Sequence, residues 1–127
     1  MNRILLSATL CAGLLFSLPA LAAEAFTKAA FTQAQEAGAD ILLHVHAPWC
    51  PTCKAQEPSV AMLEHDIPAL KVFRIDFDSQ KDILNELKVR SQSTLIAFKG
   101  KTETSRMTGV TDPKAITAMV APSAMMK

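Results

Sequence analysis

The apolar residues of this chain follow strand-like and helix-like patterns in alternation. Dense or alternating apolar runs predict strands over 41–47, 70–77, 94–98 and about 102–108. Apolar residues at helical spacing predict helices over about 27–38, 51–65, 80–88 and 113–121. The expected order is therefore helix, strand, helix, strand, helix, two strands and a final helix.

Local signals mark several of these boundaries. Gly38 is expected to end the first helix, Ser79 to cap the third, and Asp112 before Pro113 to begin the last. The short connection 99–101 predicts a hairpin between the last two strands. Strands separated by helices imply parallel crossovers, and the hairpin adds an antiparallel pair. We therefore expect an α/β fold with a mixed sheet and helices on both faces.

The first 22 residues stand apart from this pattern. Arg3 precedes an apolar run over 4–18, and Ala20-Leu21-Ala22 has the small-x-small pattern that a signal peptidase recognises. The run is shorter than the roughly 20 residues that a membrane-spanning helix needs. We therefore predict a secretory signal peptide over 1–22 and a single domain over 23–127, located in the periplasm with no membrane anchor in the mature chain.

The charge balance narrows the range of partners. The 127 residues include 13 Lys and Arg against 12 Asp and Glu, a net charge of +1, so no nucleic-acid partner is expected. Cys11 lies in the predicted signal peptide, which leaves Cys50 and Cys53 in the mature domain. Because a domain of this size buries a core without disulfides, this pair is not needed for stability.

Cys50 and Cys53 lie where the first predicted strand is followed by a helix. Cys50 would begin the first helical turn, where unpaired backbone N–H groups and the helix dipole stabilise a thiolate. Cys53 lies on the same face, and the two Cα atoms can come within the ~4.4–6.8 Å that a disulfide requires. The pair can therefore alternate between dithiol and disulfide, with Trp49 beside it to shape a docking surface.

The segment Trp49-Cys50-Pro51-Thr52-Cys53-Lys54, with Pro58 five residues after the second cysteine, resembles the thioredoxin family. The resemblance covers about 25–120 and implies a thioredoxin-like three-layer fold with a central sheet of four to five strands. It implies a thiol-disulfide oxidoreductase in which Cys50 is the nucleophile and Cys53 resolves the mixed disulfide, without a cofactor beyond this pair. The implied partners are protein thiols and disulfides, with a membrane-embedded or periplasmic redox partner.

Two histidines and the dipeptide between the cysteines bear on how closely this chain follows the family. His44 stands where family members carry a buried aspartate that accepts a proton from the resolving thiol. It could take that role, or fill the core as a neutral imidazole. His46, on the same side of the strand, is expected to pack behind the site with one ring nitrogen hydrogen-bonded. Pro51-Thr52 leaves the direction of electron flow open, because spacing alone sets no redox potential.

Ser93 stands where the family carries a cis-proline facing the cysteines. Because a cis bond before a non-proline residue costs ~2.5–4 kcal/mol, this peptide should be trans. Ser93 restores a backbone N–H and adds a hydroxyl, and either could bond a thiolate or a substrate backbone. The expected docking residues are Trp49, Pro51, Thr52, Ser93 and Thr94.

Metal binding is the main alternative function. Cys50, Cys53, His44 and His46 include ligand types suited to Cu(I) or Zn(II). However, His44 should be buried below the helix, and two cysteines on one turn are an incomplete shell for a four-ligand site. We therefore favour redox exchange without a bound metal over a metal-binding or redox-silent module.

Overall fold

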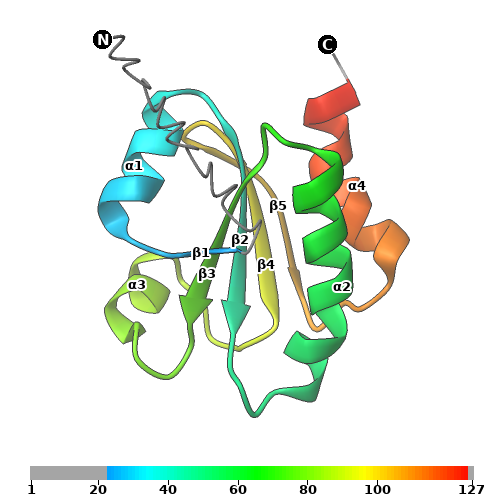
Figure 1. The fold of residues 1–127 in the computed structure, drawn as a ribbon. Helices are drawn as coiled ribbons and strands as arrows, with labels where there is room; N and C mark the ends of the chain where they lie inside the picture. The colour runs from blue at the N-terminus through cyan, green and yellow to red at the C-terminus, as the bar shows by residue number, and fades with distance from the viewer. Residues whose placement is uncertain (1–22, 126–127) are drawn as a thin grey trace, which may run out of the picture.

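The computed structural model describes residues 23–125, so the predicted signal peptide and Cys11 lie outside the described residues (Figure 1). The sheet consists of β1 (Glu24–Ala25), β2 (Asp40–His46), β3 (Lys71–Asp76), β4 (Thr94–Lys99) and β5 (Thr102–Thr108). The helices are α1 (Lys28–Glu36), α2 (Pro51–Asp66), α3 (Lys81–Glu86) and α4 (Pro113–Met125). None of these helices is long and apolar enough to cross a membrane.

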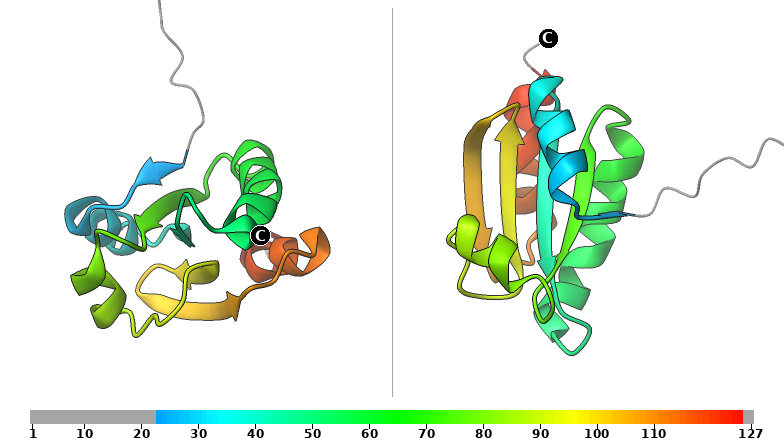
Figure 2. Two further views of the ribbon diagram at one scale, coloured as in Figure 1. Left: turned by 90° about the horizontal axis from the view of Figure 1, so that it is seen from below. Right: turned by 90° about the vertical axis from the view of Figure 1, so that its left-hand side faces the viewer.

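The five strands form one mixed sheet in the order β1-β3-β2-β4-β5. β3 pairs in parallel with both β1 and β2, whereas β4 is antiparallel to β2 and forms a hairpin with β5. α1 and α3 cover one face, and α2 and α4 cover the other (Figure 2). The predicted three-layer α/β fold with a mixed sheet is confirmed.

The structure differs from the sequence-based expectation at several element ends. β1 was not predicted, because its two residues are exposed and carry no apolar pattern. The prediction that Ser79 caps α3 is wrong: the N-cap is Gln80, and Asp76 Oδ1 accepts hydrogen bonds from the Ser79 N–H and hydroxyl. α3 is also shorter than expected and α4 longer. The predicted cap of α4 is confirmed, because Asp112 Oδ2 accepts from the Ala115 N–H at 2.9 Å.

The side-chain alternation of β2 divides the core between the two faces of the sheet. Ile41, Leu43 and Val45 pack beneath α1 and α3, whereas Leu42 packs beneath α2 and α4. By the same alternation His44 lies on the α2 face of the sheet. β2 therefore runs toward the cysteines at the start of α2, and its buried His44 lies directly beneath that helix.

Candidate active site

The two cysteines occupy the start of α2, immediately beyond β2. Cys50 is the N-cap residue, with extended backbone, and its Sγ accepts a hydrogen bond from the Cys53 N–H at 3.1 Å. Pro51 holds the first helical position, where its missing N–H leaves no bond unmade. Both cysteines are free thiols, and the exposed fraction of Cys50 is only 3%. The local geometry is that of a thiol held against the positive end of a helix.

Cys53 is fully buried behind Cys50. Its Sγ lies 3.7 Å from the carbonyl oxygen of Val45 in β2. Burial, followed by the hydrogen bond with Cys50, raises the pKa of Cys53 to about 11, while backbone groups of Ala47 and Ser93 act in the opposite direction. Cys53 is therefore protonated at neutral pH in this dithiol form.

Three of the expected docking residues lie around the start of α2. Trp49 is 57% exposed, and its Nε1 donates to Asp78 Oδ2 at 2.9 Å. Its ring also packs edge-on against Phe77, with centroids 6.3 Å apart. Pro51 is exposed and Thr52 is half-buried. An exposed, fixed indole thus lies next to the buried sulfur of Cys50.

The other two expected docking residues, Ser93 and Thr94, are buried. No peptide bond within residues 23–125 is cis, so the bond before Ser93 is trans as expected. The Ser93 N–H donates to Val45 O at 2.9 Å and its hydroxyl to Gln92 O at 2.6 Å. The Thr94 hydroxyl contacts Ser91 O and Thr108 Oγ1. The donors that Ser93 adds are thus bonded within the protein rather than left free for a substrate.

His44 is completely buried, and its Nε2 lies 3.1 Å from Gln56 Oε1. Its Nδ1 has no partner among the described residues. Burial, followed by the neighbouring His46, lowers the pKa of His44 to about 4. A base this weak is poorly matched to the Cys53 thiol, with its pKa of about 11. These properties favour the neutral core imidazole over the proton acceptor.

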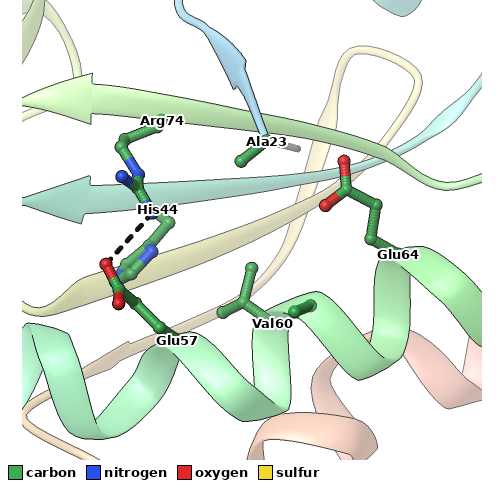
Figure 3. Close-up of a pocket in the computed structure, with 7 residues that line it drawn as sticks. Ala23, His44, Glu57, Val60, Glu64 and Arg74 are labelled. Atoms are coloured by element: carbon green, nitrogen blue, oxygen red, sulfur yellow. Dashed lines mark hydrogen bonds and ion pairs between the residues drawn. The ribbon is translucent and has the colours of Figure 1, made fainter. Parts of the chain in front are cut away.

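His46 packs behind the site, as expected, with its ring edge-on to that of His44 at 5.5 Å. Its Nε2 lies 2.9 Å from Glu57 Oε1, which also accepts from Arg74 at 3.2 Å. Glu57, Arg74 and His44 line a pocket of about 230 Å³ between α2 and the sheet (Figure 3). Glu64 lines it too, and burial raises the pKa of that carboxyl. A pocket lined by both ionisable and apolar side chains therefore lies on the α2 side of the sheet.

The contacts of the two histidines bear on metal binding. Each imidazole has its polar contact with a side chain of α2, Gln56 or Glu57, rather than with a cysteine. Residues 23–125 contain no group of three or more His, Cys, Asp or Glu side chains placed to hold a metal ion. The geometry thus gives no support to the alternative function.

Gln56 carries no motif in the sequence, yet it is the most connected polar side chain beneath the cysteines. Its Nε2 donates to Ser93 O at 3.1 Å and to Val110 O at 2.8 Å, and its Oε1 contacts His44. Its position in the sequence could have indicated burial. It belongs to a stripe at helical spacing whose members are all buried: Cys53, Gln56, Val60 and Leu63. A polar residue within that stripe must find partners inside the fold.

Comparisons with known proteins agree with this fold and site. The thioredoxin family model matches residues 22–122, and the chain belongs to the thioredoxin family. The structure is similar to that of Trxlp from Edwardsiella tarda EIB202, with a TM-score of 0.74, 41% identity and coverage of 76% of this chain and 96% of that one.

Curated relatives place the protein in the same class. A thioredoxin H-type of Fagopyrum esculentum is 30% identical over 79 residues, 62% of this chain and 68% of the relative. A thioredoxin of Chlamydia trachomatis is 29% identical over 80 residues, 63% of this chain and 78% of the relative. The protein is a thioredoxin-like thiol-disulfide oxidoreductase.

Proposed function

We propose that the protein exchanges disulfides with protein thiols in the periplasm, with Cys50 as the nucleophile and Cys53 as the resolving thiol. The observation that carries the assignment is the bond from the Cys53 N–H to Cys50 Sγ at the N-cap of α2. The N-terminus of a helix favours negative charge, and the thiolate is the attacking species in disulfide exchange. Cys53, one turn away and buried, is shielded from substrate.

The reaction proceeds in two reversible steps. The Cys50 thiolate attacks one sulfur of a substrate disulfide, which forms a mixed disulfide and releases the other substrate sulfur as a thiolate. Cys53 then loses its proton to solvent and attacks Cys50 Sγ, which forms the Cys50–Cys53 disulfide and releases the second substrate thiolate. Two electrons pass from the protein dithiol to the substrate, and the reverse sequence oxidises a substrate dithiol.

Substrate proteins would dock beside Trp49, Pro51 and Thr52, which lie at the surface around Cys50. No cofactor beyond the cysteine pair is required, and a periplasmic or membrane-embedded redox partner would restore the pair after each exchange. The proposed location rests on the leader pattern of residues 1–22. Cell fractionation and the mass of the exported chain test it: we expect a periplasmic protein that begins at Ala23.

Redox equilibration tests the assigned chemistry. The purified protein is equilibrated with glutathione buffers while the fluorescence of Trp49, its single tryptophan, reports the state of the pair. We expect a midpoint potential between roughly −120 and −270 mV. Metal content is measured on the same sample. Failure to form the disulfide at any potential, together with stoichiometric copper or zinc, would replace the redox assignment by metal binding.

Substitution of each cysteine tests the two roles separately. We expect Cys50→Ser to reduce exchange with a protein disulfide to the uncatalysed rate. Cys53→Ser should still attack but accumulate the mixed disulfide, which mass spectrometry detects as a covalent adduct on Cys50. An adduct that forms on Cys53 in the Cys50→Ser variant, at the wild-type rate, would reverse the assignment.

A further inference from the structure

We propose that Gln56 is a positioning residue for the resolution step, in which Cys53 displaces the substrate from Cys50. The inference rests on the roles proposed above for the two cysteines. Gln56 follows Cys53 by three residues on the buried face of α2 and is itself completely buried. It therefore acts on the reaction through its neighbours rather than by contact with a substrate.

The side-chain amide of Gln56 uses both of its donor hydrogens and its oxygen. Its Nε2 has two hydrogens and two acceptors: Ser93 O before β4 and Val110 O after β5. Its Oε1 faces His44 Nε2 on β2. Gln56 thus joins α2 to three segments that surround the resolving cysteine.

These contacts fix the tautomer of His44. The two carbonyl groups require the NH₂ end of the Gln56 amide, so Oε1 is the atom that faces His44. Because an amide oxygen only accepts, His44 Nε2 must carry the hydrogen. The remaining nitrogen, Nδ1, is then unprotonated and has no partner among the described residues. His44 is thereby held as one neutral tautomer beneath the site.

The link from Gln56 to Cys53 passes through Ser93 and Val45. The Ser93 N–H donates to Val45 O at 2.9 Å, and the same oxygen lies 3.7 Å from Cys53 Sγ. The Ser93 amide and the Cys53 thiol therefore share an acceptor and are close neighbours. When Cys53 loses its proton to attack Cys50, the Ser93 N–H can bond to the new thiolate, a charge-assisted interaction.

Ser93 needs to be held in place for this contact. Its φ is +57°, a left-handed backbone conformation that a residue with a Cβ adopts at a cost. Gln56 holds the Ser93 carbonyl on one side of this strained residue, while Val45 holds its N–H on the other. Ser93 O accepts from two donors, the Gln56 amide and the Gly109 N–H, so loss of the Gln56 amide removes one of them and lets Ser93 shift relative to Cys53, which weakens the bond from its N–H to the forming thiolate.

Two-phase exchange kinetics test the proposal. A chromogenic aromatic disulfide releases one coloured thiolate when Cys50 attacks and a second when Cys53 resolves the mixed disulfide. In Gln56→Met we expect attack within about twofold of wild type and resolution slower by about tenfold, the effect of losing one hydrogen bond to a charged group. Gln33→Met, an exposed glutamine of α1, is the matched control and should match wild type in both phases.

NMR of the histidine ring nitrogens reports the tautomer of His44, which a merely structural role of Gln56 would not change. Wild type should show His44 protonated at Nε2 alone, and Gln56→Met should lose this single tautomer. Gln56→Glu keeps an acceptor for His44 but lacks the two amide donors, so it should keep the Nε2–H and still resolve slowly. Ser93 O also accepts from the Gly109 N–H, a contact that neither substitution removes directly. If Gln56→Met fails to fold, Gln56→Glu decides the question.

Wild-type resolution rates in the folded variants overturn the role of Gln56 and leave the proposed function intact. Equal slowing of attack and resolution also overturns it, because it indicates a general disturbance of the site. If the wild-type protein forms no mixed disulfide, the proposed function fails and this inference fails with it.

Discussion

The two faces of the sheet are packed with different chemistry. Beneath α1 and α3, four phenylalanine rings meet at centroid distances of 5.3 to 6.3 Å, and every buried member of that cluster is apolar. Beneath α2 and α4 the cluster is aliphatic, and buried His44, Gln56 and Ser59 lie beside it. Buried polar groups lower stability unless they are paired, so His44, Gln56 and Ser59 make the second face the more costly one. That cost falls on the face that bears the cysteines.

Substitution of a ring should give the largest effect on stability. Phe31→Ala removes a side chain that packs on Phe26, Phe73 and Phe98. We expect the free energy of unfolding to fall by about 3–5 kcal/mol in urea titrations. Exchange per folded molecule should be unchanged, since α1 lies across the sheet from the cysteines. A lower exchange rate in the folded variant would show that the two faces are coupled.

Lowering the pH should lower the stability of the protein through buried His44 on the α2 face. In the unfolded chain His44 takes up a proton near its ordinary pKa of 6.5, but burial keeps it neutral in the folded protein down to about pH 4. Between these values only the unfolded chain binds the proton, so stability falls as the pH falls from 6.5 to 4, by about 3 kcal/mol from this group.

His44→Leu should remove this part of the pH dependence. At neutral pH the variant should be less stable by about 1–3 kcal/mol, because Gln56 Oε1 loses its donor. Unfolding titrations of both proteins from pH 7 to 4 measure the difference, and NMR titration of the His44 ring checks the cause. A ring that titrates near pH 6.5 in the folded protein would contradict the explanation.

Ion pairs should give the smallest effects, and they differ between the faces. Lys28 and Glu86 join α1 to α3 with side chains 67% and 55% exposed, whereas Glu57 bonds both Arg74 and His46 on the α2 face. We expect Lys28→Ala to cost less than about 0.5 kcal/mol and Arg74→Ala up to about 1 kcal/mol. Urea titrations in low and high salt measure both values. A larger loss for Lys28→Ala would reverse this ranking.

The sequence predicted the elements whose signals are local. β2 and α2 follow from a dense apolar run and from Pro51 at the first helical position, and the N-cap position of Cys50 follows from their junction. Ser79 was predicted to cap a helix from its residue type alone, but its N–H and hydroxyl instead donate to Asp76 Oδ1. β1 left no pattern because parallel pairing with β3 defines it, not the burial of its side chains.

The contacts of Gln56 and the backbone of Ser93 could not be predicted in the same way. Gln56 reaches partners 12, 37 and 54 residues away, and sequence periodicity gives the face of a helix but not the carbonyl groups that meet it. Ser93 was expected to offer its N–H and hydroxyl to a sulfur or a substrate. The positive φ and the bonds to Val45 and Gln92 arise only when the loop is folded.

The left-handed backbone of Ser93 also limits which residues this position can accept. Proline is confined to φ near −65° and has no N–H, so it fits neither the +57° of Ser93 nor the bond to Val45 O. Substitution of Ser93 by proline would therefore require a different loop backbone. Glycine, in contrast, would enter this position without rebuilding it. Ser93→Gly should therefore keep this loop as it is, whereas Ser93→Pro should not.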